Sequence, residues 1–75
     1  MAQPTYSLRA LVLRRTKLGE SDLILTLLSE DGSQKRAVAK GARRPKSSFA
    51  ARTEPFCVID ALCATGRSLD ILKEA

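Results

Sequence analysis

The sequence predicts an all-β domain: a five-stranded OB-fold barrel with a short helical segment between strands three and four. Apolar runs of β-forming composition recur along the chain between short turn sequences, and a basic, proline-containing link separates the third run from the fourth. The 75 residues suffice for one small domain, residues 1–75. A small SH3-like barrel is the main alternative. The long link favours the OB fold, which characteristically has a capping helix at that position.

The first two strands are predicted at residues 6–15 and 23–28. In the first, apolar and polar residues alternate before the run becomes continuously apolar and ends in charge. Gly19, Glu20 and Asp22 interrupt the pattern, and we interpret this acidic pair as turn chemistry rather than as an acid–base pair. The second run, Leu-Ile-Leu-Thr-Leu-Leu, predicts a strand that is buried on one face and partly covered on the other.

The third strand, residues 34–40, follows a hairpin loop at 29–33. Gly32 can adopt the positive φ that a tight reversal needs, and Asp31 can hydrogen-bond its own backbone. Because side chains alternate across a strand, each face of this strand carries at least one cation. One face has Lys35, Ala37 and Ala39, and the other has Arg36, Val38 and Lys40.

The remainder of the chain predicts a link and a hairpin. In the link, residues 41–54, Ser47 and Ser48 could cap a short helix through residues 49–52. The fourth strand is predicted at 56–64, a turn at 65–68 and the last strand at 69–73.

The densest chemical signal lies between residues 35 and 52, where basic residues cluster and no Asp or Glu occurs. With a net charge of +5, this stretch favours a polyanion, above all nucleic acid, as the partner. A charge run can also be a solvated surface, but clustering in one strand and its outgoing loop favours contact with a phosphate backbone. The predicted nucleic-acid-binding residues are Lys35, Arg36, Lys40, Arg43, Arg44, Lys46 and Arg52. A second basic group would extend the same face if the first and third strands lie close together: Arg9, Arg14, Arg15 and Lys17.

The composition argues against catalysis and metal binding. There is no histidine, no phosphate-binding glycine motif and no nucleophile beside an evident base, so we expect a protein that is not an enzyme and needs no cofactor. Two cysteines cannot supply the four ligands of a structural zinc site. Cys57 and Cys63 fall in one predicted strand, roughly 20 Å apart. They therefore cannot form a disulfide, and we expect both in the core.

The three aromatic residues are too few for base stacking to dominate binding. Phe56 begins an apolar run and is expected in the core, Phe49 is expected to plug one end of the barrel, and Tyr6 alone is a candidate for an exposed platform. We therefore expect salt-sensitive binding with weak sequence selectivity.

Three segments carry a family resemblance: Leu-Arg-Ala-Leu-Val-Leu-Arg-Arg at 8–15, Gly-Glu-Ser-Asp-Leu-Ile-Leu-Thr-Leu-Leu at 19–28, and Ala-Val-Ala-Lys-Gly-Ala-Arg-Arg-Pro-Lys-Ser at 37–47, the last followed by Glu-Pro-Phe. Together they resemble the N-terminal domain of the bacterial RecO family, and Ala-Lys-Gly-Ala-Arg is the most specific part. The resemblance implies an OB fold whose third strand and following loop contact DNA. In this chain it extends that role to Lys40, Arg43, Arg44 and Lys46.

The same resemblance implies a DNA repair and recombination mediator that anneals single strands and helps to load the recombinase RecA. The implied partners are single- and double-stranded DNA and RecR, with single-strand-binding protein and RecA reached through the full-length protein. It also implies that the chain is an N-terminal fragment, because these proteins continue into a helical domain, often with a zinc-binding cysteine cluster. One departure is Gly32-Ser33-Gln34, where relatives commonly place a basic residue after the hairpin glycine.

The sequence also fits two alternative functions. The chain could be a protein-interaction barrel that docks RecR or other repair proteins with little DNA binding of its own, or a basic domain that prefers structured RNA. No apolar run approaches the roughly 20 residues of a spanning helix, and the start lacks a secretory signal. We therefore expect a cytoplasmic protein without a membrane partner.

Overall fold

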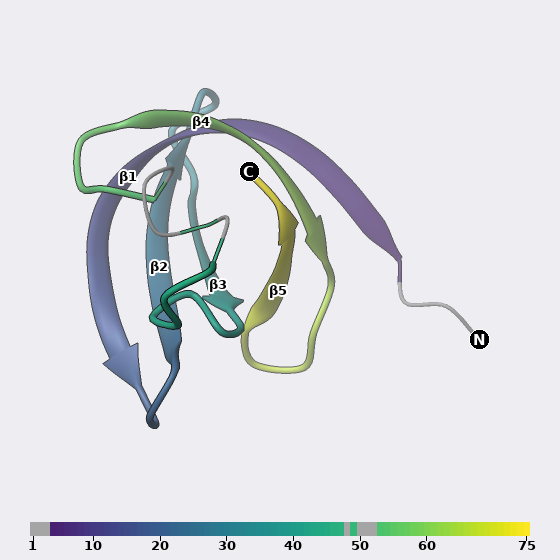
Figure 1. Cartoon of the computed structure of the whole chain (residues 1–75). Coiled ribbons are helices and arrows are strands. Elements are labelled where there is room, and N and C mark those ends of the chain that lie inside the picture. The colour runs from purple at the N-terminus through teal and green to yellow at the C-terminus, as the bar shows by residue number, and fades with distance from the viewer. Residues whose placement is uncertain (1–3, 48, 50–52) are drawn as a thin grey trace.

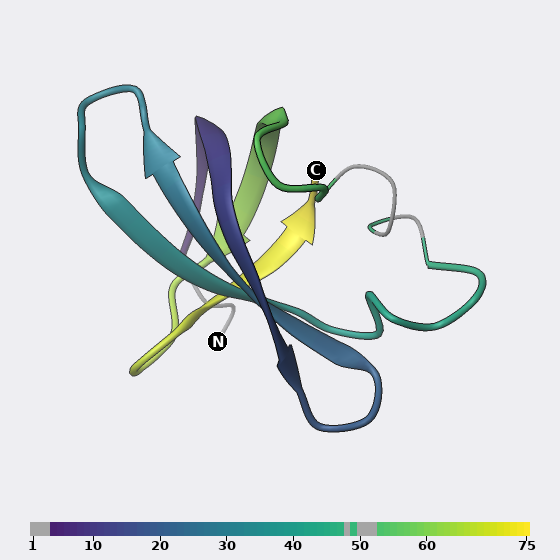
Figure 2. The ribbon, with the colours of Figure 1, turned by 90° about the vertical axis from the view of Figure 1, so that its left-hand side faces the viewer.

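The fold is a closed five-stranded barrel (Figures 1 and 2). The computed structural model describes residues 4–47, 49 and 53–75. The strands run in the spatial order β1-β2-β3-β5-β4, and β1 pairs with both β2 and β4. All neighbours are antiparallel except β3 and β5, which pair in parallel. This confirms the predicted OB barrel. The strands are β1 (Thr5–Leu18), β2 (Asp22–Ser29), β3 (Gln34–Ala39), β4 (Val58–Ala64) and β5 (Asp70–Glu74).

Strand β1 closes the barrel because it is long enough to serve two neighbours. Its 14 residues extend beyond the predicted strand at both ends. The first half pairs with β4 and the second half with β2, and the register shifts between Val12 and Arg14. Leu13 is therefore an extra residue, and such a β-bulge bends and twists its strand. In Figure 2 the β1–β2 turn and the β2–β3 hairpin lie at opposite ends of the barrel.

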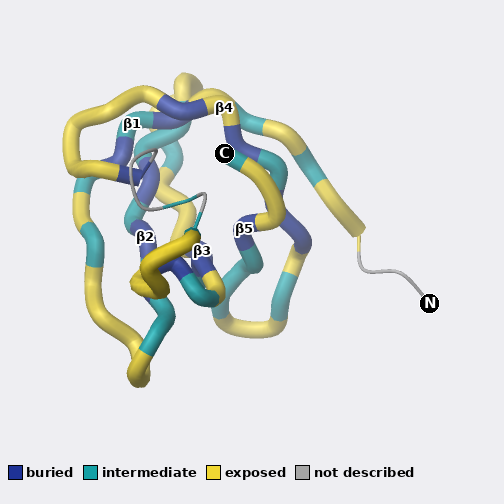
Figure 3. The backbone as a smooth tube through the Cα atoms, in the orientation of Figure 1, coloured by how far each residue is buried: buried dark blue, intermediate teal, exposed yellow. Residues whose placement is uncertain are grey.

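The core lies inside the barrel and follows the alternation predicted for β2. Leu23, Leu25 and Leu27 are buried, whereas the residues between them are partly exposed (Figure 3). Small side chains such as Ala37 and Ala39 on β3 leave room for these leucines in a narrow interior. Further buried residues from the other strands are Ala10, Val12, Ile59, Ala61, Cys63 and Leu72.

The link after β3 begins as turns that dock onto the β1–β2 connection. The N–H of Gly41, at a φ of 70°, donates to the Asp22 carboxylate (2.7 Å), and the N–H of Arg43 donates to the Ser21 carbonyl (2.9 Å). Ala42 between them is buried. These bonds fix the start of the link against the barrel, and they give Asp22 the structural role expected of a turn residue.

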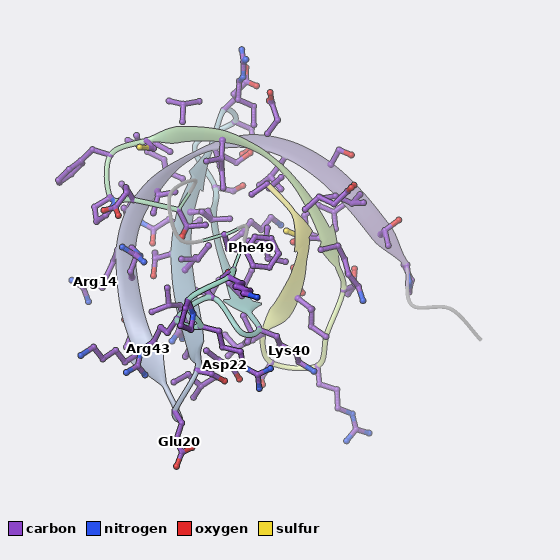
Figure 4. All side chains as sticks on the ribbon, in the orientation of Figure 1. Arg14, Glu20, Asp22, Lys40, Arg43 and Phe49 are labelled. Atoms are coloured by element: carbon purple, nitrogen blue, oxygen red, sulfur yellow. The ribbon has the colours of Figure 1, made fainter. Side chains whose placement is uncertain are left out.

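The rest of the link was predicted to contain a short helix. Most of that segment, 48 and 50–52, lies outside the described residues. Phe49 packs against the core, as predicted for a plug, and in Figure 4 it lies over the barrel interior. Its carbonyl accepts hydrogen bonds from the N–H (3.0 Å) and the hydroxyl (2.7 Å) of Thr53, a buried residue.

Two predictions about single side chains were wrong, those that placed Phe56 and Cys57 in the core. Phe56 is 78% exposed and Cys57 is exposed, because β4 begins at Val58 and both residues belong to the preceding turn. Tyr6 is half-buried against the core, and its hydroxyl donates to the Asp70 carboxylate, so it is not an open platform. Cys63 is buried, as expected, and both cysteines are free.

Candidate nucleic-acid interface

A row of three side chains crosses the outer face of the barrel. Arg14 on β1 lies opposite Thr26 on β2, and Thr26 lies opposite Arg36 on β3. Two strand spacings place the Cα atoms of the arginines roughly 10 Å apart, so both long side chains can reach an anion between them. Figure 4 shows Arg14 pointing away from the barrel interior.

The bulge in β1 produces this arrangement. If the register continued beyond Val12 without this shift, Leu13 would face Thr26 and Arg14 would face Leu25, which is fully buried. With it, Arg14 takes the outward position and Arg15 faces inward opposite Leu25. The backbone irregularity thus decides which arginine is available on the outer face.

A groove of about 440 Å³ follows this row. Its lining supplies two guanidinium groups together with hydroxyl and amide donors, and it contains no carboxylate. Such a set of donors suits a phosphate group, because guanidinium forms paired, charge-assisted hydrogen bonds with phosphate oxygens. The lining residues are Leu13, Arg14, Thr16, Thr26, Gln34 and Arg36.

A second group of cations follows β3, at the same end of the barrel as the β1–β2 turn; Figure 4 labels Lys40 and Arg43 of this group. Lys40, Arg43, Arg44 and Lys46 are all exposed. The guanidinium of Arg43 donates to the Gly19 carbonyl (2.9 Å), so this arginine also holds the link in place. Within the described ranges, none of these four side chains forms an ion pair.

Lys35 is separated from both groups. It lies on the inward-facing side of β3 at the opposite end of the strand, with its Nζ 5.9 Å from the centre of the Tyr6 ring. This distance is typical of a cation–π contact. The Asp70 carboxylate beside the ring accepts the Tyr6 hydroxyl and the Gly66 N–H (3.0 Å), and the Tyr6 hydrogen bond lowers the pKa of Asp70.

The seven predicted residues therefore do not form one continuous track. Arg36 is on the outer face, Lys35 is at the Tyr6 end, four cations are at the exit of β3, and Arg52 lies outside the described residues. Their contact with nucleic acid stays a prediction.

The second basic group divides in the same way. Arg9 pairs with Asp60 (3.1 Å), and Arg15 pairs with Glu54 (3.4 Å). Arg14 and Lys17 are exposed and have no ion pair in the part of the chain that the structure describes. Strand β2 separates β1 from β3, but Arg14 and Arg36 still lie in one row, because each of them is opposite Thr26.

Sequence reasoning ranked Arg14 below the third-strand cluster and missed Thr26 and Gln34. Thr26 was visible as the one polar residue in the apolar run Leu-Ile-Leu-Thr-Leu-Leu. In the described part of the chain, no three or more Cys, His, Asp or Glu side chains come together as a metal site, and no helix could span a membrane.

Fold and surface together define a small OB-fold domain with a basic groove on its outer face and a basic loop at one end. The chain belongs to the family described as recombination protein O, N terminal, whose model matches residues 1–75. This confirms the resemblance to the N-terminal domain of the RecO family that was seen in the sequence.

Its relatives include proteins named DNA repair protein RecO. That of Bifidobacterium adolescentis is 54% identical over 72 residues, 96% of this chain and 29% of the relative. Those of Bifidobacterium longum and Bifidobacterium animalis subsp. lactis are 53% identical over 70 residues, 93% of this chain and 29% of each relative. The chain thus spans less than a third of the length of these curated relatives.

Proposed function

We propose that this domain binds the phosphate backbone of DNA within a repair and recombination mediator. The observation that carries the proposal is the Arg14–Thr26–Arg36 row, a groove with two cations and no carboxylate. The exposed cations at the exit of β3 provide a second contact region. Since phosphate contacts carry no sequence information themselves, binding is expected to be weakly selective.

In the full-length protein, this contact would serve strand annealing and the loading of RecA, with RecR and single-strand-binding protein as partners. The domain itself would act by binding, without bond chemistry, in the cytoplasm. The family membership supports these roles, and the name of the relatives, DNA repair protein RecO, connects those proteins to DNA repair.

The proposal is tested by the salt dependence of binding. Fluorescence anisotropy with a labelled single-stranded 20-mer, from low to moderate salt, should give a steep linear fall of log K against log salt concentration. The double variant R14A/R36A should reduce that slope by about 1.4, because two phosphate contacts are lost at roughly 0.7 each for single strands.

The control is R67A/K73A, which removes the same charge from exposed positions on the β4–β5 turn and β5. It should leave the slope nearly unchanged. A flat salt response of the unmodified protein, or equal effects of the two double variants, would contradict specific backbone contact at the row.

A further inference from the structure

Phe56 occupies a turn position that favours glycine. The Cys57 N–H donates to the Glu54 carbonyl (3.2 Å), which closes a four-residue turn with Pro55 second and Phe56 third, at a φ of 69°. This is the pattern of a type II turn, in which proline suits the second position and glycine the third. Among the described residues, Phe56 is the one non-glycine with positive φ.

The surrounding structure holds Phe56 in this conformation. Its N–H donates to the Val12 carbonyl (2.7 Å), and the Val12 N–H donates to the Cys57 carbonyl (2.9 Å). Glu54, at the start of the turn, also pairs with Arg15. All three contacts anchor the turn to β1 around its bulge. A strained residue kept in place by such contacts points to function, provided that packing does not explain it.

Packing does not explain Phe56. With 78% of its surface exposed, it contributes little to the core. A glycine would satisfy the backbone better at little cost in burial. An aromatic ring is therefore exposed to solvent at a position where the backbone favours glycine and where a large apolar side chain would usually be buried.

A partly exposed apolar strip begins two residues after Phe56, on the outer face of the barrel. Val58, which is 62% exposed, lies opposite Leu11, and Leu11 lies opposite Leu28. A groove of about 240 Å³ runs along the strip, with Arg9 and Glu30 also in its lining. On β2, Leu28 is two residues from Thr26, so the strip and the arginine row are about 7 Å apart.

An apolar row next to a cationic row matches the two sides of a single nucleic-acid strand, whose phosphates and unpaired bases project in different directions. A duplex hides its bases and could use only the cationic row. We infer that Phe56 stacks on a base of a single strand whose backbone crosses Arg14 and Arg36, with Val58 and Leu11 supporting the neighbouring base. This inference rests on the proposed function and adds a preference for single strands.

The test compares F56G with the unmodified protein on two 12-mers, oligothymidylate and an abasic strand with the same number of phosphates. Loss of one stacked base should weaken oligothymidylate binding roughly 5- to 100-fold. Abasic binding should change less than about twofold, because the phosphate contacts remain. F56L keeps apolar bulk without a ring and should lose most of the same affinity. L18A, at another partly exposed apolar residue on β1, is the control and should bind both strands normally.

Folding can be checked separately, because glycine suits this turn and F56G should melt no earlier than the unmodified protein. Since the chain has no tryptophan, F56W also provides a unique tryptophan, whose fluorescence should be quenched by oligothymidylate and not by the abasic strand. Equal weakening of oligothymidylate and abasic binding, or no change in either, would overturn the inference. If neither affinity changes, the exposed ring is better explained by contact with a protein partner. If F56G unfolds, an unquenched F56W overturns it instead. Failure of the unmodified protein to bind any strand would overturn the proposed function itself.

Discussion

The Tyr6 hydroxyl donates a hydrogen bond to the Asp70 carboxylate, joining the first strand of the barrel to the last across 64 positions of sequence. The bond lies near the parallel contact of β3 and β5, which has two paired positions in the ladder, Ala37 with Asp70 and Val38 with Ile71. A side-chain bond from β1 therefore supports the shortest pairing in the barrel.

The environment of Tyr6 should be visible in a spectroscopic titration. Burial, followed by the hydrogen bond to Asp70, raises the pKa of Tyr6 above its ordinary value of 10.0. Since this is the single tyrosine in the chain, absorbance at about 295 nm follows its ionisation alone. The phenol should stay protonated at a pH where the denatured protein is half ionised, and stability should fall as the pH rises through the folded value. Identical titrations of folded and denatured protein would contradict this.

The pKa of Asp70 gives a second prediction, which concerns stability at acidic pH. The Tyr6 hydrogen bond lowers the pKa of Asp70, so its stabilising effect exists above the unfolded pKa and is lost as the pH falls through the folded one. Y6F should lower the free energy of unfolding at neutral pH by about 1 kcal/mol, with a smaller difference in acid. Urea denaturation at several pH values measures this. D60N, at the exposed Arg9 pair, is the control and should cost under about 0.5 kcal/mol.

The hydrogen bond that docks the basic link onto Asp22 should contribute to the stability of the domain. D22A removes the carboxylate that accepts the Gly41 N–H, leaving a partly buried donor unpaired. We expect a loss of about 1–2 kcal/mol in unfolding free energy. E20A, two residues earlier in the exposed β1–β2 turn, is the control and should stay within about 0.5 kcal/mol. Equal effects of the two substitutions in chemical denaturation would show that the bond does not hold the link.

Two glycines should respond differently to alanine. A Cβ on Gly66 would lie 1.9 Å from the Leu69 carbonyl oxygen, so G66A forces the backbone to move and should cost more than about 2 kcal/mol. Gly19 has open space but a φ of 62°, so G19A should cost only about 1–2 kcal/mol. Thermal unfolding followed by circular dichroism ranks them, and the reverse order would contradict the geometry.

Substitutions of Arg43 and of Arg44 should differ in their effect on stability while both weaken DNA binding. R43A loses the bond to the Gly19 carbonyl as well as a charge, so it should reduce both stability and DNA affinity. R44A should reduce affinity similarly and lower the salt slope by about 0.7, with little change in stability. A binding loss confined to one base identity in either variant would indicate direct base recognition instead.

Local pattern was enough to predict the barrel but not the orientation of every side chain. The alternation in β2 placed Leu23, Leu25 and Leu27 inside correctly. Phe56 was misplaced because an apolar run does not reveal a positive φ, although the preceding Pro55 was a turn signal. The placement of Lys35 beside Tyr6 depends on closure of the barrel by distant strands, which one sequence does not display.

The bulge at Leu13 also bears on how this strand can vary among relatives. Arg14 pairs with Thr26 and the regular register resumes beyond it, so removing the extra residue would leave every later partner unchanged. Insertions and deletions at this one position are therefore compatible with the same charged surface. Elsewhere in the β1–β2 ladder, inserting or deleting one residue would turn the following inward-facing side chains to the outer face of the barrel, and the outward-facing ones to the interior.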